Sequence, residues 1–260
     1  MLAAERRALI LRLLRRDGIA PLADIARLSG ASDATVRRDL AGLAAEGLAE
    51  RVHGGAVARA GSEAAVGAPD RAAEVPLEER AGIAAEKKRR IARRAAALCA
   101  DGDTIMVDGG STTLQLAPFL RGLRLRVITN SLPLAEELSR EAACTVILGG
   151  GVVQPVSRLI LDPFRDDPFS DYSASTVFMG VFGIDEAGAT NTDELLIRTE
   201  RAMIARARRL VVLADSRKFG LRGSLHLCGF DRISTVVTDD GASERYRQLL
   251  ASYGVETIIA

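Results

Sequence analysis

The 260-residue sequence lacks an excess of charge of either sign, and it lacks long hydrophobic runs. Its formal net charge of +1 excludes a protein coated with positive charge, so any contact with nucleic acid must depend on locally placed arginines. The apolar run from Leu9 to Leu14 is interrupted by Arg12 and flanked by charge, which excludes a signal-peptide core and a membrane span. The sequence therefore predicts a cytoplasmic protein without a membrane partner.

Cysteine and histidine are scarce. Cys99, Cys144 and Cys228 are scattered in apolar surroundings, which is typical of buried thiols in a reducing compartment. No CxxC or CxxH spacing occurs, so we expect no metal site. The glycine motifs that bind nucleotides in kinases and dehydrogenases are also missing. Since the sequence holds only two histidines and no carboxylate and lysine constellation at motif spacing, we expect neither catalytic residues nor a cofactor.

The bulk composition is ordinary for a globular protein. Hydrophobic residues make up 48% of the chain and the mean hydropathy is +0.11, which allows a sizeable core. A chain of this length suits one small and one medium domain, and we expect them at residues 1–58 and 87–260. Alanine, glycine, glutamate and proline dominate the start of residues 59–86, which predicts a linker whose last part, Leu77 to Ala85, is helical.

Three helical patterns follow one another in residues 1–58. Apolar residues recur at helical spacing from Leu9 to Leu14, and again after Pro21, which suits a first helical turn. Gly30 ends the second pattern, and Ser32 is placed to cap a third helix that runs on through Leu40. Two helices joined by a short glycine-containing turn predict a helix-turn-helix.

The third helix has two contrasting faces. Val36 and Leu40 belong to its apolar face, whereas Arg38 lies among small alanines on the opposite face, with Thr35 and Arg37 beside it. Alanines allow close approach to a duplex, and arginines reach phosphates or guanine edges. The alternative for an arginine pair taken alone is a solvated helix face.

The residues after the third helix decide between these readings. Leu48 to Val52 alternates like a short strand, and His53-Gly54-Gly55 supplies a tight turn before a returning strand. A two-stranded wing of this kind would lie along the phosphate backbone beside the third helix. We therefore expect a winged helix-turn-helix whose DNA contacts are Ser32, Thr35, Arg37, Arg38, Arg51 and His53.

Residues 87–260 alternate between apolar β-branched runs and helical patterns, which predicts a parallel sheet covered on both faces. The expected strands are 104–107, 125–128, 145–148, 176–179, 210–213, 235–237 and 255–259. The expected helices between them include 113–120, 133–140, 199–208 and 243–252.

Polar and glycine residues follow these strands, at the sheet edge where parallel folds bind ligands. In the loop from Asp108 to Thr113, glycines leave backbone N–H groups open, hydroxyls follow, and a helix start attracts an anion such as a phosphate. A plain strand-to-helix turn with capping hydroxyls is the alternative.

Lysine occurs only at positions 87, 88 and 218, so a lysine just past a strand end indicates a need for a compact ammonium group. A surface accident is the alternative for Lys218, and we take the Lys87–Lys88 pair as such an accident. The expected effector-binding residues are Asp108, Gly109, Gly110, Ser111, Thr112, Thr113, Thr129, Asn130, Gly149, Gly150, Asp215 and Lys218.

These motifs together resemble the DeoR family of bacterial sugar-operon regulators over nearly the whole chain. The resemblance rests on Thr35 to Leu40 and Arg51 to Gly55 in the first part. In the second part it rests on Asp108–Thr113, Thr129–Ser131, Leu148–Gly150, Phe178–Gly180 and Asp215–Gly220. It implies an α/β chain in which a winged helix-turn-helix is joined to a parallel-sheet sensor domain resembling ribose-5-phosphate isomerase. Gly110 and Arg217 depart from the family pattern, with Arg217 in place of a usual Ser. In addition, Glu200 stands where many members carry Lys.

The resemblance implies a homodimer or homotetramer that represses a carbohydrate-utilisation operon and leaves its operator DNA when a phosphorylated sugar binds. One alternative is a sugar-phosphate isomerase with an accessory DNA-binding domain. Another is an activator, or a protein that represses when the effector is bound.

Overall fold

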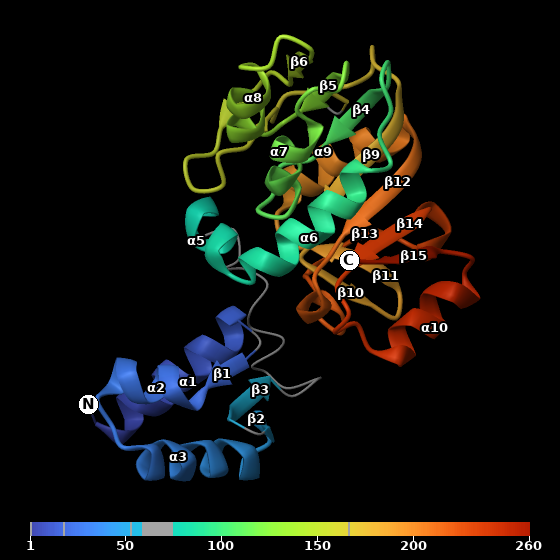
Figure 1. Ribbon diagram of the computed structural model, residues 1–260. Helices are drawn as coiled ribbons and strands as arrows, with labels where there is room; N and C mark the ends of the chain where they lie inside the picture. Colours follow the sequence, from blue (N-terminus) through green and yellow to red (C-terminus); the bar gives the residue numbers. More distant parts are fainter. Residues whose placement is uncertain (1, 18, 53, 59–74, 166) are drawn as a thin grey trace. The chain divides into compact units, whose positions relative to one another are not determined.

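The computed structural model describes residues 2–17, 19–52, 54–58, 75–165 and 167–260 (Figure 1). The chain divides into two compact units, Met1–Ala72 and Ala73–Ala260. Residues 75–86, which we expected in the linker, belong to the second unit. They form α5 (Leu77–Gly82) and the start of α6 (Ala85–Ala96), and they bury the side chain of Leu77. The burial of Leu77 accounts for the place of these residues in the second unit instead of in the linker.

Within its described residues, the first unit combines three helices with a three-stranded antiparallel sheet of order β1-β3-β2. Its elements are α1 (Ala3–Asp17), β1 (Ile19–Pro21), α2 (Leu22–Ser29), α3 (Asp33–Ala45), β2 (Ala49–Val52) and β3 (Gly55–Ala58). Ile10, Ile25, Val36 and Leu43 are completely buried in its core. Pro21 ends β1 and caps α2 instead of lying in its first turn, because its partner in the sheet is Gly55. The winged helix-turn-helix is present, with β1 as a strand that the sequence did not reveal.

The second unit is built on a seven-stranded parallel sheet of order β15-β14-β12-β9-β4-β5-β6. Its strands are β4 (Thr104–Val107), β5 (Arg126–Thr129), β6 (Thr145–Leu148), β9 (Ala174–Gly180), β12 (Ala207–Leu213), β14 (Thr235–Thr238) and β15 (Glu256–Ile259). All seven predicted strands are confirmed, and β9 and β12 extend further toward their amino ends than their apolar runs do.

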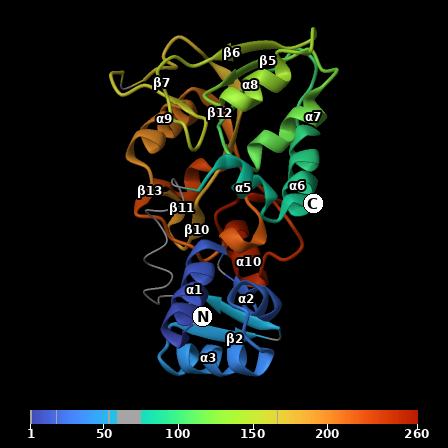
Figure 2. The ribbon, with the colours of Figure 1, turned by 90° about the vertical axis from the view of Figure 1, so that its left-hand side faces the viewer.

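Two helical layers cover this sheet. On one face lie α6, α7 (Ala117–Leu120) and α8 (Leu132–Leu138), whose buried side chains pack with Ile105 and Val107 of β4. On the other face lie α9 (Glu194–Ala205) and α10 (Glu244–Ser252), which pack with Met106 of the same strand. Figure 2 shows α6 and α7 on one side of β12 and α9 on the other. Alternate residues of each strand therefore point into different layers.

Several short elements lie outside the predicted pattern. They are the antiparallel sheet β10 (Gly183–Asp185), β11 (Gly188–Asn191) and β13 (Leu225–Cys228), the ribbon β7 (Val152–Val153) and β8 (Ile160–Leu161), and the 3-10 turns η2 (Thr113–Leu116), η3 (Ser216–Lys218) and η4 (Phe230–Arg232). Strands this short carry too few residues for a two-residue period to show. None of the described helices is long and apolar enough to cross a membrane.

Candidate nucleic-acid interface and effector site

The start of helix α3 is fixed by its own hydroxyl groups. Ser32 has an extended backbone and accepts a hydrogen bond from the backbone N–H of Thr35, over 3.4 Å. The two hydroxyls are also 2.9 Å apart and share a hydrogen bond. Ser32 is exposed and Thr35 is half-buried, so both expected DNA contacts lie at the helix start with one lone pair already engaged.

Helix α3 turns its arginines outward. Val36 and Leu40 are 0% and 2% exposed in the core of the unit, which sets the rotation of the helix. Arg37 and Arg38 follow Val36 and are both exposed, as is the small Ala34. The face that we expected to approach DNA therefore carries two guanidinium groups without a bulky apolar side chain between them.

The wing depends on two glycines with different tasks. Gly54 has a φ of +90°, a backbone conformation that other residues rarely adopt. Gly55 lies against β1, where a Cβ atom would come 2.4 Å from the carbonyl oxygen of Ala20. Arg51 is exposed on β2, one strand of the wing. His53, the other expected contact, lies outside the described residues.

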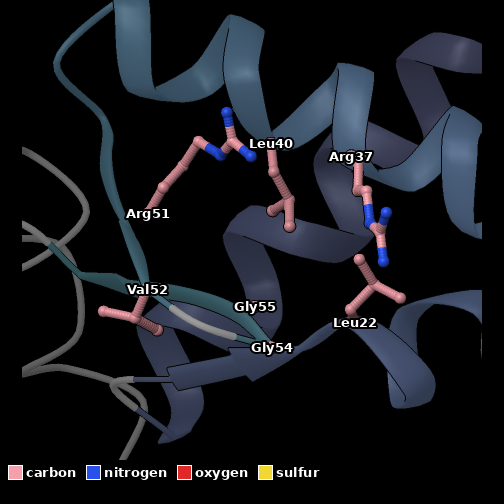
Figure 3. A pocket seen from close by; sticks show the side chains of 7 residues that line it. All are labelled: Leu22, Arg37, Leu40, Arg51, Val52, Gly54 and Gly55. Atoms are coloured by element: carbon pink, nitrogen blue, oxygen red, sulfur yellow. The ribbon is translucent and has the colours of Figure 1, made fainter.

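A hollow of about 360 Å³ separates α3 from the wing. It is lined by Leu22, Arg37, Leu40, Arg51, Val52, Gly54 and Gly55. Figure 3 shows Arg37 entering it from α3 and Arg51 from β2. Neither guanidinium forms an ion pair with a described residue. Two cations that line one hollow suit a single phosphate of a DNA backbone.

Asp39 of the recognition helix contacts another helix. Its Oδ2 accepts a hydrogen bond from Nε of Arg6, and the two side chains are 12% and 10% exposed. This ion pair joins α3 to α1. Asp39 therefore positions the recognition helix, a role that its spacing in the sequence did not reveal.

In the second unit, Asp108 and Gly109 open the expected effector loop at the end of β4. Asp108 is 2% exposed, and its Oδ1 accepts a hydrogen bond from Nδ2 of Asn130. The backbone N–H of Gly109 donates to Oδ1 of the same Asn130 over 2.8 Å, so this N–H is not open to a ligand as we expected. Among the described residues, the backbone N–H groups of Gly110, Ser111 and Thr112 form no hydrogen bond, so the anion-binding part of the loop begins at Gly110.

The helix expected from Thr113 is shorter than the pattern suggested. Residues 113–116 form the 3-10 turn η2, and the α-helical part α7 has only 4 residues. Thr113 is fully buried, and its hydroxyl donates to the carbonyl oxygen of Gly110. A helix this short has a small dipole, so an anion here must be held by the open backbone N–H groups of the loop and by side chains.

Thr129 and Asn130 brace the loop from β5. The hydroxyl of Thr129 donates to the carbonyl oxygen of Val107 over 2.6 Å and accepts from the backbone N–H of Ser131. Both residues are fully buried. Their polar groups are therefore used within the protein, and they position Asp108 and Gly109.

The other expected effector residues lie too far apart to serve one small ligand. Gly149 and Gly150 follow β6, whereas Asp215 and Lys218 follow β12, and three strands separate β6 from β12 in the sheet. With about 4.8 Å between neighbouring strands, these ends lie roughly 19 Å apart. Cationic side chains gather on the side of the sheet edge that carries Asp215, and they are Lys88, Arg217 and Lys218.

Lys88 is the centre of these cations. It is 3% exposed, and its Nζ donates to Oγ of Ser111 over 3.0 Å and to the carbonyl oxygen of Arg80. Burial lowers the pKa of Lys88 to about 7; the carboxylate of Asp215 opposes this shift, and nearby cationic groups, Lys218 first among them, add to it. An anion bound here would relieve this crowding of positive charge.

Two further groups complete the edge. The buried carboxylate of Asp215 is held by Nε and Nη2 of Arg217 at 2.8 and 3.0 Å; burial opposes its ionisation, but this pairing keeps its pKa below the usual range. Nζ of Lys218 lies 5.5 Å from the ring centre of Phe182.

Lys87 connects α6 to two loops at this edge. Its Nζ donates to Asp239 in the loop after β14 and to Ser216 in the loop after β12.

Comparison with known proteins adds the family. A model described as the DeoR C terminal sensor domain matches residues 83–240, and a model described as a DeoR-like helix-turn-helix domain matches residues 6–60. The chain belongs to the DeoR family. It is a DNA-binding transcriptional regulator, and the expected winged helix-turn-helix with a sensor domain is confirmed.

Relatives in the DeoR family match this chain over almost its whole length. A relative from Escherichia coli O157:H7 that is named for the aga operon is 30% identical over 98% of this chain and 93% of its own. The glycerol-3-phosphate regulon repressor of Escherichia coli K12 is 28% identical over 98% of both chains. The transcriptional regulator UlaR of Shigella flexneri serotype 5b is 29% identical over 99% of both.

Solved structures resemble the chain more loosely. Ribose 5-phosphate isomerase A from Methanocaldococcus jannaschii is 19% identical and covers 51% of this chain and 53% of its own, with a TM-score of 0.37. The translation initiation factor eIF-2B of Pyrococcus horikoshii OT3 is 20% identical and covers 85% and 82%, with a TM-score of 0.46. At such TM-scores neither likeness bears on function.

The DeoR sensor unit contains charged residues whose place the sequence analysis missed. Lys87 and Lys88 are not surface accidents, because Lys87 pairs with Asp239 and Lys88 contacts the carbonyl group of Arg80. One signal was available for Lys88, since it precedes the buried Ile91 and Ala92 by three and four residues and so shares their helix face. No local signal marked Arg80.

Proposed function

We propose that this protein is a repressor that holds operator DNA with its first unit and releases it when a phosphorylated sugar binds its second unit. The names of its relatives support repression, since they include the repressor of a glycerol-3-phosphate regulon. Control of a carbohydrate-utilisation operon is the biological role that fits this chemistry.

The DNA-binding half of the proposal uses α3 and the wing. Arg38 lies on the exposed face of α3 and is placed to read base edges in a major groove, whereas Arg37 and Arg51 hold one backbone phosphate. Because the net charge of the chain is only +1, this local concentration of arginine supplies the attraction to DNA.

The observation that carries the effector half is the buried Lys88 beside Ser111. An ammonium group that is 3% exposed, bonded to a loop with three open backbone N–H groups and surrounded by further cations, calls for an anionic partner. The phosphate of a sugar phosphate meets this need with up to three oxygens. The phosphate site then comprises Lys88, the loop from Gly110 to Thr112, and Lys218.

Release of DNA requires a defined difference in binding energy. To change the DNA-bound fraction from about 99% to about 1%, the effector must bind the released state more tightly by about 5.5 kcal/mol. Charge-assisted hydrogen bonds of about 1.5–3 kcal/mol each supply this difference if two to four of them form in the released state alone.

The proposal includes a homodimer or homotetramer, because paired recognition helices match paired operator half-sites. It also includes a cytoplasmic location, where operator DNA is accessible. Sedimentation of the full chain with and without operator DNA measures the oligomer directly.

The test is a gel-shift titration with DNA from upstream of the protein's own gene. Inorganic phosphate and a panel of pentose and hexose monophosphates are added to the complex. We expect at least one sugar monophosphate to release the DNA. Tightened binding would instead identify a protein that acts on DNA in its bound state, and no response to any member of the panel would contradict the proposed effector class.

Two variants separate the two halves in the same assay. Arg38→Ala should lose DNA binding and keep its thermal stabilisation by the effector, because Arg38 lies outside the second unit. Lys218→Ala should bind DNA normally and fail to release it. A Lys218→Ala protein that is released normally would contradict the position of the phosphate site.

A sugar-phosphate isomerase is the second candidate, and one observation favours it. Asp108 and Glu200 are both buried, and burial raises the pKa of Asp108 to about 7. Enzymes tune carboxyl groups in this way for acid–base catalysis. Incubation of the same panel with the protein, followed by NMR detection of aldose–ketose conversion, decides between the two. We expect no turnover, and conversion abolished by Asp108→Asn would establish the enzyme.

A further inference from the structure

Glu200 is the buried acid of helix α9. It is 1% exposed, and its Oε1 accepts a hydrogen bond from Nδ2 of Asn191 over 2.7 Å. Its Oε2 has no hydrogen-bond partner among the described residues. Buried polar atoms in folded proteins almost always have a partner, so an orphaned oxygen indicates a missing one.

Glu200 lies in the same layer as Asp108. On β4, Met106 points into the layer between the sheet and α9, so Asp108, two residues later, points to the same side. On α9, Ile197 and Met203 stand three residues either side of Glu200, and both pack with Met106. Strand alternation and helix spacing therefore place both carboxyl groups in one layer.

The protonation state of Glu200 decides whether its Oε2 can donate a hydrogen bond or only accept one. Burial raises the pKa of Glu200 well above its usual range, and the negative charge of Asp108 adds to this. Both causes favour the neutral, protonated form of the carboxyl group. Because Oε1 already accepts from Asn191, the proton of that form lies on Oε2, which is then a hydrogen-bond donor without an acceptor among the described residues.

The buried cation Lys88 comes from the opposite layer. Lys88 belongs to α6, whose Ile91 and Ala92 pack with Ile105 and Val107 on the other face of the sheet. The edge thus has a buried cation on the α6 side and the hydrogen-bonding acid Glu200 on the α9 side. A phosphorylated sugar complements this arrangement, since its phosphate is an anion and the rest of it carries hydroxyl groups.

We propose that Glu200 donates a hydrogen bond from Oε2 to a hydroxyl oxygen of the effector and so selects the sugar. This inference rests on the proposed function, which supplies the phosphate at Lys88. A buried acid beside Asp108 disfavours a second anionic group on the ligand. The effector class is therefore a sugar monophosphate with an uncharged, hydroxyl-bearing end.

The experiment measures binding to the full-length protein by titration calorimetry, with inorganic phosphate and pentose and hexose monophosphates as probes. Two variants are compared with the wild type. Glu200→Gln keeps a donor and an acceptor in the same shape, and Glu200→Leu removes both. Glu194→Gln and Glu194→Leu are the matched controls, because Glu194 is an exposed glutamate at the start of the same helix.

We expect the wild type to bind one sugar monophosphate more tightly than inorganic phosphate. Glu200→Leu should weaken the binding of that sugar monophosphate by about tenfold or more, and should change the affinity for inorganic phosphate by no more than about twofold. Glu200→Gln should restore most of the difference, and both Glu194 variants should bind like the wild type. If the role of Glu200 were merely structural, Glu200→Leu would weaken the binding of inorganic phosphate and of the sugar phosphate equally, and that result would overturn the inference.

A second measurement needs no variant and so does not depend on how Glu200→Leu folds. The wild type should bind the preferred monophosphate at least about tenfold more tightly than the bisphosphate of the same sugar. Equal binding of the two would overturn the inference while the phosphate site at Lys88 still stands. If the wild type binds neither phosphate nor any sugar monophosphate, the proposed function itself fails, and the inference fails with it.

Discussion

Nζ of Lys88 lies 3.0 Å from Oγ of Ser111, and this hydrogen bond joins helix α6 to the loop after β4. The same Nζ donates to the carbonyl oxygen of Arg80 on α5. One ammonium group therefore connects three segments at the carboxyl edge of the sheet. A phosphate that binds the loop would also interact with this ammonium group. Lys88 therefore connects a phosphate bound at the loop to helices α5 and α6.

The first prediction concerns this ammonium group. Lys88→Met keeps much of the apolar stem and removes the charge, so phosphate affinity should fall by about 10- to 100-fold, as expected for a lost charge-assisted hydrogen bond. The melting temperature without ligand should stay the same or rise, because a buried cation crowded by other cations has been removed. Thermal shift with increasing inorganic phosphate measures both. Arg89→Met, on an exposed position of the same helix, is the control, and equal loss in both variants would contradict the site.

The second prediction concerns pH and the unliganded protein. Burial raises the pKa of Asp108 from 3.8 to about 7, so between these values the folded state binds more protons than the unfolded state. The free energy of unfolding should therefore fall as pH rises from about 4 to about 7, by up to about 1.4 kcal/mol per pH unit. Burial lowers the pKa of Lys88 from 10.5 to about 7, so above pH 7 the unfolded state binds more protons and the free energy of unfolding should rise again.

Urea unfolding of the second unit across this pH range tests the prediction, with the two groups separated by substitution. Asp108→Asn should make the fall on the acid side of the curve shallower, and the fall that remains is due to the raised pKa of Glu200. Lys88→Met should flatten the alkaline side. A wild-type curve that rises steadily from pH 4 to 7 would show that Asp108 is ionised in the folded protein.

The third prediction concerns the hollow between α3 and the wing. If Arg37 and Arg51 hold one phosphate together, either alanine variant should lower the slope of log affinity against log salt by about 1. The Arg37→Ala, Arg51→Ala double variant should lower it by about 1 as well, since the shared contact is lost only once. Fluorescence anisotropy with labelled operator DNA at several salt concentrations measures these slopes.

Arg27→Ala is the control for this series, because Arg27 lies on α2, outside the hollow, and pairs with Asp24. Its salt slope should match that of the wild type. A double variant whose slope falls by about 2 would mean that the two arginines hold separate phosphates.

The sheet and the helix-turn-helix were predictable because their signals are local. Thr145 to Leu148 is a β-branched apolar run whose bounds match β6, and Val36 and Leu40 share a face through helical spacing alone. Lys88 was predictable on the same grounds, from its distance to Ile91. Lys218 was predicted because it is a rare lysine just past a strand end, whereas the Lys87–Lys88 pair does not follow a strand.

The rest of the site depends on contacts between distant parts of the chain. Asp108 and Glu200 share a layer only because β4 and α9 pack against each other, and no spacing in the sequence expresses that contact. The same holds for Asp39, whose partner Arg6 is 33 residues away on another helix. Such pairs are set by tertiary packing, and they include the residues on which specificity depends.

The bond from Lys88 to the carbonyl oxygen of Arg80 has one further consequence. Arg80 belongs to α5, the first helix of the second unit, and Nε of the same Arg80 donates to the carbonyl oxygen of Val75 over 3.1 Å. A single residue thus touches the sensor's cation through its backbone and the beginning of the unit through its side chain. A displacement of Lys88 would therefore be passed to Val75, near the start of the second unit, through one short helix and without crossing the sheet.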